Sequence, residues 1–309
     1  MTYAIKRILG MIPVLLITWT IVFAVLQAIP GDPVNLMLAG RPASEEVRER
    51  ERQRLGLDRP VLERYVTFLW RAVQGDLGES FRTRKPVTEM ILEQLPPTLE
   101  LAIGGLVVGL AIGVTFGIIA GIRPNGWVDS IVMFLALAGI SLPSFWIGML
   151  LIYVFGNVLR WVPIVGEGFS ALILPSITVG LFLAGGLARM IRSSVLEVMG
   201  QDYIRTARSK GLAPAVVIMK HALRNAMIPP LTLFGIHFGL LITGAVITES
   251  VFARPGLGTM LLNAVLTKDI PLVQALVVYA TGVYILINLI VDLLYGVIDP
   301  RIKLGSKAA

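Results

Sequence analysis

The chain has 309 residues, of which 55% are hydrophobic and 15% are charged, and its mean hydropathy is +0.79. This composition excludes a soluble domain, which needs a polar shell, and favours a protein that lies in the bilayer. The net charge of +7 comes from basic residues beside apolar runs, so we expect it to orient the chain in the membrane and not to bind nucleic acid. There is no cysteine, which excludes disulfides and thiolate sites.

Six apolar windows without Asp, Glu, Lys or Arg are long enough to span a membrane, which takes about 20 helical residues. We expect the first window to be an uncleaved anchor, because its apolar region is too long for a signal peptide. The expected spans are residues 8–29, 101–122, 131–159, 168–188, 226–248 and 270–291.

The Lys and Arg residues of the short loops predict the orientation. Residues 189–224 contain seven of them, whereas the segments after the third and fifth windows contain only Arg160, Arg254 and Lys268. Both termini are also basic, with Lys6 and Arg7 at one end and three basic residues after 300. We therefore expect both termini and residues 189–226 in the cytoplasm.

Residues 30–97 form a long loop that we expect outside, since long loops cross the membrane largely regardless of charge. Ser44 is predicted to cap a charged helix ending near Gly56, and Asp58 to cap a second helix ending at Gly75. The apolar face of this second helix has helical spacing and consists of Leu62, Tyr65, Val66, Leu69, Trp70 and Val73.

The second window has a glycine at every fourth position, which places these glycines in line along one helix face and opens a groove for a neighbouring helix. Gly235 and Gly239 repeat the pattern in the fifth window. Static packing and a surface that slides during transport both remain open. The groove residues are Gly105, Gly109, Gly113, Gly117 and Gly121.

The third window contains a proline flanked by serines, which predicts a kink in mid-membrane. This kink is a candidate for the translocation path, formed by Ser141, Pro143, Ser144 and Phe145. Glu249 and Asp292 lie at window ends and are first interpreted as interfacial charges. Glu249 is also a candidate for the path, if it faces a water-filled vestibule.

Residues 202–230 carry the most specific pattern. Asp202 is predicted to cap a helix of about two turns, which Gly211 ends in a left-handed conformation before Pro214 begins another. Two interpretations remain open from spacing alone. Either the helix rests on anionic lipid, or it enters a groove of a cytoplasmic protein whose acidic groups bind Arg205 and Arg208.

This loop resembles the coupling loop of binding-protein-dependent ABC importer permeases. Residues 203–212 read Tyr-Ile-Arg-Thr-Ala-Arg-Ser-Lys-Gly-Leu, and residues 221–227 read His-Ala-Leu-Arg-Asn-Ala-Met. Arg205, His221 and Arg224 depart from the general pattern but agree with its peptide-importer branch. Further landmarks of that branch's first permease subunit are Ile29-Pro30-Gly31-Asp32-Pro33, Leu55-Gly56-Leu57-Asp58, Gly75-Asp76-Leu77-Gly78, Pro255-Gly256-Leu257-Gly258 and Asp292-Leu293-Leu294-Tyr295-Gly296.

The resemblance implies an all-α polytopic protein with six transmembrane helices, a type I ABC importer permease fold, in a bacterial or archaeal cytoplasmic membrane. It implies four partners besides lipid, namely a second homologous permease, two ATP-binding-cassette ATPases and an external substrate-binding protein. The substrate would be a dipeptide or oligopeptide, with glutathione or a nickel chelate as alternatives. The implied ATPase-coupling residues are Tyr203, Arg205, Thr206, Ala207, Arg208, Lys210, Gly211, His221 and Arg224.

The chain has no Gly-x-x-x-x-Gly-Lys-Ser/Thr loop, so ATP and Mg are expected on the partner subunits and no cofactor on this chain. His221 and His237 lie apart, and we expect neither a metal site nor catalytic residues. A secondary transporter or channel, and a membrane enzyme, are the rival classes. The expected units are residues 1–29, 30–97, 98–298 with the cytoplasmic loop 189–226, and the tail 299–309.

Overall fold

The computed structural model describes residues 2–27, 33–38, 44–166, 168–227, 230 and 245–298. The regular elements of this part of the chain are helical, and its extended backbone pairs only in a single bridge between Glu79 and Pro86. The structure therefore confirms the all-α prediction. Most of the fifth predicted window, with Gly235, His237 and Gly239, and the tail 299–309 lie outside the described residues.

Four helices precede the central bundle, and three of them belong to the predicted external segment. They are α1 (Thr2–Gln27), α2 (Pro33–Leu38), α3 (Glu45–Arg54) and α4 (Val61–Val73). The rest of the chain forms α5 (Val87–Ile122), α6 (Trp127–Ser141), α7 (Ser144–Leu151), the π-helical segment η1 (Ile152–Val158), α8 (Phe169–Met199), α9 (Asp202–Ser209), α10 (Pro214–Val216), the π-helical segment η2 (Val217–Ala222), α11 (Leu223–Ala226), α13 (Val246–Val251), α14 (Leu257–Leu266) and α15 (Ile270–Ile298).

Three of the described helices, α5, α8 and α15, are long and apolar enough to cross a membrane. The bent pair formed by α6 and residues 144–158 would add a fourth, and the apolar part of α1, Leu9–Val25, lies within the first predicted window. Six spans are compatible with this set, because the fifth window falls mostly outside the described residues. Helix α5 begins eleven residues before the expected boundary at 97/98 and runs through Pro96 and Pro97 without a break.

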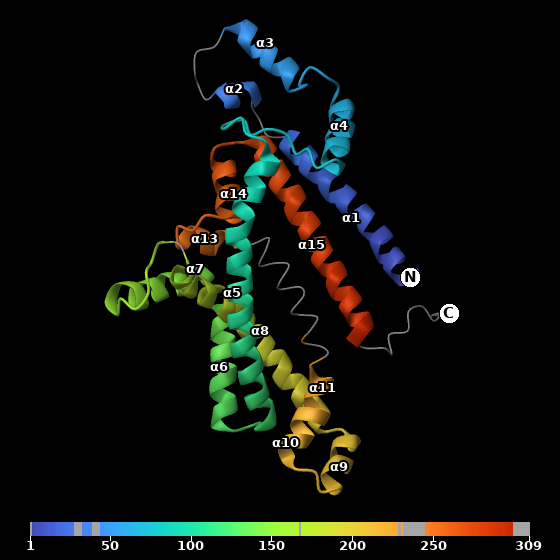
Figure 1. Cartoon of the computed structure of the whole chain (residues 1–309), viewed down its shortest axis with the longest axis vertical. Helices are drawn as coiled ribbons and strands as arrows, with labels where there is room; N and C mark the ends of the chain where they lie inside the picture. The colour runs from blue at the N-terminus through green and yellow to red at the C-terminus, as the bar shows by residue number, and fades with distance from the viewer. Residues whose placement is uncertain are drawn as a thin grey trace.

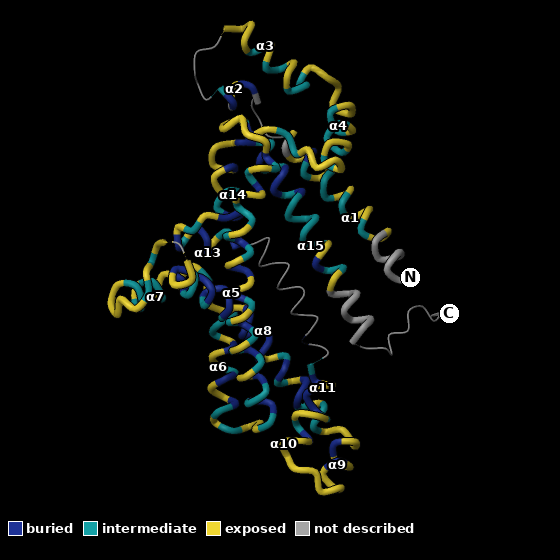
Figure 2. Tube along the Cα trace, viewed as in Figure 1, coloured by how far each residue is buried: buried dark blue, intermediate teal, exposed yellow. Residues whose placement is uncertain are grey.

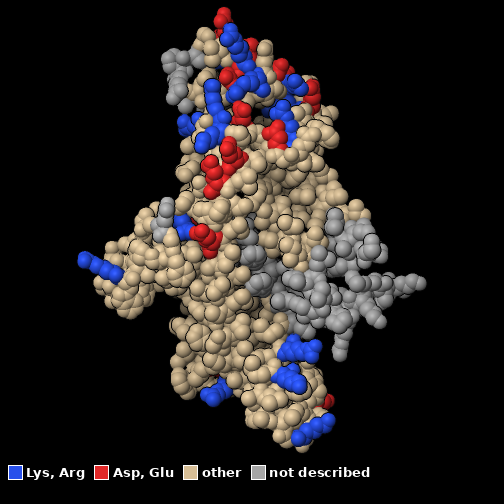
Figure 3. Space-filling view, viewed as in Figure 1, with Lys and Arg blue, Asp and Glu red and all other residues tan. Residues whose placement is uncertain are grey.

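The ends of the molecule differ in charge, as the orientation argument requires. Helices α2, α3 and α4 gather at one end of the long axis and α9, α10 and α11 at the other (Figure 1). Figure 3 shows both signs of charge over the end with α3 and α4, mainly Lys and Arg at the end with α9, and few charges between them. A belt with few charges between two charged ends is what a bilayer-spanning protein needs.

The core of the bundle is the contact between α5 and α8. A Cβ atom added at Gly105, Gly109 or Gly113 would lie 2.6–2.8 Å from Val179, Leu183 or Leu187 of α8. Gly117 and Gly121 are equally close to Ile191 and Val195. Only glycine allows the two helices to approach this closely. The buried seam along α5 and α8 is visible in Figure 2.

The bend that the sequence predicts in the third window is present at Pro143, and it is sharper than a simple kink. Helix α6 ends at Ser141, and residues 144–158 turn away from it by 106°. Leu142 is extended (φ −78°, ψ 135°), as a residue before proline prefers, and Pro143 then accepts the first bonds of α7 from Trp146 and Ile147. Proline here begins a new helix and does not merely bend an old one.

Candidate functional site

The candidate coupling helix α9 follows α8 through a short turn. Gln201, and not Asp202, is the N-cap residue, because Gln201 is extended (φ −74°, ψ 149°) while Asp202 already has helical backbone. The N–H groups of Ile204 and Arg205 donate to the carbonyl of Gln201. The Asp202 side chain is 97% exposed and lies 3.7 Å from Arg205, a weak surface pair.

One face of α9 is fixed to the rest of the fold. Ile204 is 0% exposed, and Ala207 is also buried. Both pack with Val217 and Ala222, and Val198 of α8 covers the same cluster. Burying an Ile side chain stabilises by about 1.5–3 kcal/mol, so α9 is anchored to the end of α8 rather than hanging in solvent.

The other face of α9 is exposed and basic. Among the described residues, no carboxylate lies within ion-pair distance of Arg208 or Lys210, so their charges are available to a partner. His221 is half-buried in η2, and Arg224 of α11 is exposed. The exposed residues of the coupling segment are Tyr203, Arg205, Thr206, Arg208, Lys210 and Gly211.

The end of α9 has the geometry that the sequence predicts. Gly211 is left-handed (φ +76°), its N–H donates to the carbonyl of Arg208 at 2.9 Å, and the N–H of Leu212 donates to that of Ala207 at 3.4 Å. These two bonds make a Schellman cap. Pro214 then begins α10.

A contact that the sequence did not reveal joins the two sides of this loop. The amide Nδ2 of Asn225 in α11 donates to the hydroxyl of Tyr203 in α9 at 2.9 Å. The two residues are 22 positions apart, and no local pattern pairs them.

A partly buried ion pair lies at the same end of the bundle. Arg192 of α8 donates to both carboxylate oxygens of Asp129 of α6, at 2.5 and 2.7 Å. The N–H of Asn125, which is left-handed (φ +63°), donates to Asp129 as well. The Asp129 side chain is only 5% exposed. The sequence analysis used Arg192 only to predict the orientation and did not identify Asp129 as its partner. Each is a single charge beside an apolar window, and no local pattern connects the two.

Glu249 is neither an interfacial charge nor a path-lining residue in this conformation, which corrects both expectations. It is 0% exposed in α13. The hydroxyl of Thr98 in α5 donates to its Oε1 at 2.7 Å, and the N–H of Thr259 in α14 donates to its Oε2 at 3.0 Å. The N–H of Leu257 in turn donates to the Thr98 hydroxyl. A buried carboxylate is tolerated where such donors satisfy it.

Two glycines make room for this carboxylate. A Cβ atom at Gly256 would collide with the Glu249 side chain, and one at Gly258 would lie 2.5 Å from Cα of Val246. The Arg254 side chain is 9% exposed and forms an ion pair with Glu100 of α5 at 2.6 Å. This pair is a second contact between α5 and the segment that joins α13 to α14. The Glu249 cluster (Thr98, Glu249, Gly256, Gly258 and Thr259) therefore joins α13, α5 and α14.

We predict that Glu249→Ala lowers the stability of the protein, because it leaves the Thr98 hydroxyl and the Thr259 N–H buried without an acceptor. Each such group costs about 1–3 kcal/mol. The measurement is thermal unfolding of the purified protein in detergent. Glu93→Gln, an exposed carboxylate on α5, is the control and leaves the midpoint unchanged. Equal midpoints for Glu249→Ala and the wild type would contradict the assignment.

The remaining path candidates lie at the bend between α6 and α7. Ser141, Pro143 and Phe145 are exposed there, and Ser144 is half-buried. Helix α7 contacts α13, since a Cβ atom at Gly148 would lie 3.2 Å from both Val251 and Phe252. The bend therefore neighbours the Glu249 cluster through α7, although the structure does not place the four residues against Glu249 itself.

An open cavity of about 480 Å³ lies beside the Glu249 cluster, between the loop at 80–83, the start of α5 and α14. Ser80 donates to Asp269 at 2.5 Å and thereby holds one wall. The cavity is in the size range of small-molecule sites. Its exposed polar lining residues are Arg82, Thr83, Asn263 and Thr267, and among the described residues no carboxylate pairs with Arg82.

In the part of the chain that the structure describes, no three His, Asp or Glu residues lie close enough to hold a metal ion. His237 and the side chain of Asp292 are outside that part. The described residues thus present an exposed basic helix, two polar clusters and a cavity. These features suit binding to a partner and helix packing, and they do not form a catalytic arrangement of nucleophile, base or metal ligands.

Two families match the chain. Residues 113–304 match the family described as binding-protein-dependent transport system inner membrane component, and residues 1–102 match the corresponding N-terminal family. The chain is 44% identical over 304 residues to the glutathione transport system permease protein GsiC of Escherichia coli strain K12, covering 98% of this chain and 99% of that protein. GsiC of Shigella flexneri serotype 5b has the same identity and coverage.

Solved structures are similar at the level of the fold. The MetNI methionine ABC transporter in an inward-facing conformation has a TM-score of 0.57 at 18% identity, covering 67% of this chain and 95% of that chain. An amino acid ABC transporter has a TM-score of 0.50 at 15% identity, covering 70% of this chain and 95% of that chain.

Proposed function

Because this chain belongs to the binding-protein-dependent transport system inner membrane components, the permeases of ABC importers, we propose that it forms part of the path by which glutathione enters the cell. It is a multi-pass subunit of the inner membrane and not itself an enzyme. The observation that carries the substrate proposal is the 44% identity to GsiC along nearly the whole chain. Small peptides are the second candidate, from the peptide-importer pattern of residues 203–212.

The assembly that we propose contains a second homologous permease, two ATPase subunits that hold ATP and Mg, and an external substrate-binding protein. Helix α9 is the contact to an ATPase, because its basic face is exposed while Ile204 anchors its other face. A short basic helix of this kind fits an acidic groove.

The structure supports a physical route from α9 to the spans. Ile204 packs on Val198 of α8, the Asp129–Arg192 pair holds α8 to α6, and the glycine seam holds α8 to α5. We propose that these contacts move as one rigid unit when the ATPases close. Packed helices transmit such displacements because their interiors do not compress.

The cavity beside the Glu249 cluster supports glutathione as the substrate. Glutathione carries two carboxylates, and Arg82 offers a guanidinium at the cavity wall, with Asn263 and Thr267 as neutral hydrogen-bonding groups. Part of its lining, Ser80, Arg82 and Thr83, belongs to the loop that follows the external helix α4 in the chain.

The test is uptake by the complete importer, with its ATPases, second permease and binding protein reconstituted in liposomes. We expect ATP-dependent accumulation of labelled glutathione that excess unlabelled glutathione abolishes and dipeptides or nickel chelates do not. If dipeptides compete and glutathione does not, peptide import replaces the proposal. Uptake driven by a proton gradient without ATP would instead indicate the rival class, a secondary transporter.

A further inference from the structure

Helix α4 has a wider apolar surface than its neighbours cover. At about 100° per residue, its apolar positions occupy about half of the helix circumference, and its polar positions, Glu63, Arg64, Thr67 and Arg71, occupy the remainder. The sequence placed this helix in the external subdomain and predicted for it an apolar face with helical spacing. In the structure only part of that face has a core to pack against.

The covered part of α4 lies on α1. The Tyr65 and Thr20 hydroxyls are 2.6 Å apart and hydrogen-bonded, and the ring centroids of Phe23 and Tyr65 are 5.3 Å apart. Phe68 stacks on Phe23 at 5.8 Å and contacts Trp19 edge-on at 6.5 Å. These contacts fix both the rotation of α4 and its position along α1.

The uncovered part is a continuous apolar stripe. It consists of four residues with helical spacing, each between 57% and 74% exposed, and none is charged. We call it the α4 stripe: Leu62, Val66, Trp70 and Val73. Exposed apolar surfaces of this kind mark a contact with a partner or with a membrane.

The position of α4 along α1 identifies the occupant. The apolar window of α1 covers residues 8–29, and Trp19, Thr20 and Phe23 lie inside it. With about 1.5 Å per residue, these contacts lie about 6–12 Å below Gln27, the last described residue of α1, at the depth of the outer leaflet. A helix attached there cannot be wholly in the external aqueous phase.

The α4 stripe also continues a surface that is expected to face lipid. Leu9, Ile12 and Leu16 lie on the same face of α1 as Thr20 and Phe23 and are 43–58% exposed. Figure 1 shows α4 beside the upper part of α1, so this exposed face runs on from the α4 contacts. A Trp on the apolar face and arginines on the polar face, here Arg64 and Arg71, are typical of helices that bind at the membrane interface.

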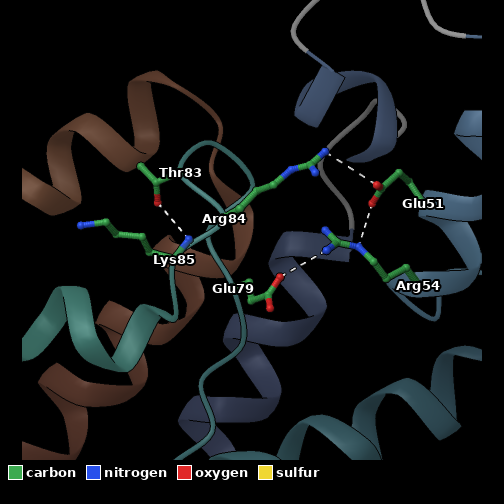
Figure 4. A network of polar contacts seen from close by, with 6 residues as sticks. All are labelled: Glu51, Arg54, Glu79, Thr83, Arg84 and Lys85. Carbon is green, nitrogen blue, oxygen red and sulfur yellow. Dashed lines mark hydrogen bonds and ion pairs between the residues drawn. The ribbon is translucent and has the colours of Figure 1, made fainter.

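We propose that α4 is an interfacial anchor, with its stripe inserted in the outer leaflet of the bilayer beside α1. The anchor fixes the height of the external subdomain above the membrane. The polar network of Figure 4 joins α3 to the loop that follows α4. Arg54 at the end of α3 binds Glu51 at 2.8 Å and Glu79 at 3.4 Å, and Arg84 binds Glu51 at 3.7 Å. The external surface that meets the binding protein is thereby held at a constant distance from the bilayer.

The absence of cysteine from the chain permits a direct test in the complete reconstituted importer. Single variants Leu62→Cys, Val66→Cys and Trp70→Cys carry a nitroxide label in phosphatidylethanolamine–phosphatidylglycerol vesicles. Electron paramagnetic resonance then measures collisions with oxygen, which concentrates in lipid, and with a water-soluble nickel chelate. Ile21→Cys on α1 is the lipid reference, and Gln53→Cys on α3 is the water reference.

We expect the three α4 labels to collide with oxygen as often as the Ile21 label and at least several-fold less with nickel than the Gln53 label. Nickel accessibility equal to that of the Gln53 label would overturn the proposal. Protection from both reagents would overturn it in favour of a protein partner on the stripe. ATP-driven uptake by each labelled complex verifies that it is intact, so this result does not depend on which substrate the importer carries.

Discussion

Replacement of Gly211 by Val is expected to uncouple ATP hydrolysis from uptake. Gly211 is left-handed at φ +76°, and a β-branched residue in this region costs about 1–2 kcal/mol. No atom lies within 4 Å of a Cβ built there, so the effect comes from the backbone and not from a collision. Loss of the Schellman cap would displace Lys210 and the chain leading to Pro214, and reduce the native form of the cap about five- to thirty-fold.

The matched control is Gly211→Asn, because asparagine tolerates the left-handed region and has a side chain comparable in size with valine. The measurements are co-purification of the ATPases and the ratio of substrate transported to ATP hydrolysed in liposomes. We expect a low ratio for Gly211→Val and a ratio near the wild type for Gly211→Asn. Identical values for wild type and Gly211→Val would refute the role of α9 in coupling.

Replacement of Asp129 by Ala is expected to destabilise the protein by about 1.5–3 kcal/mol, because it removes the charge-assisted hydrogen bonds of the partly exposed Arg192 side chain. Both hydrogen bonds of the pair are short, and the Asp129 side chain is 5% exposed. The free energy of unfolding in detergent measures the loss. We also expect uptake to fall, because α6 would no longer follow the movement that α9 passes to α8.

The double variant Asp129→Leu/Arg192→Met separates charge from packing. Removing both charges of a buried pair while keeping apolar volume is often neutral or stabilising. We therefore expect the double variant to recover most of the stability that Asp129→Ala loses. If it also recovers uptake, the pair serves only to hold α6 against α8. A double variant as unstable as the single one would show that the ion pair itself is required.

The sequence by itself determined the elements whose causes are local. The apolar windows predict α1, α5, α8 and α15 because a membrane-crossing helix must satisfy its backbone internally and present apolar side chains. The glycine spacing along α5 predicts a close helix neighbour, because glycines four positions apart lie in line on one face of a helix. Gly211 and Pro214 predict a helix end and a helix start because the conformations of glycine and proline depend on little beyond the residue itself.

Only the tertiary structure decided which polar groups meet. Glu249 and Thr98 are 151 residues apart, and Asp129 and Arg192 are 63 apart, so neither pair is visible in any window of the sequence. A carboxylate at the end of an apolar run fits an interface, a vestibule or a buried cluster, and the outcome depends on whether donors come within about 3 Å. The half-covered face of α4 was decided in the same way, by the helix that packs against it.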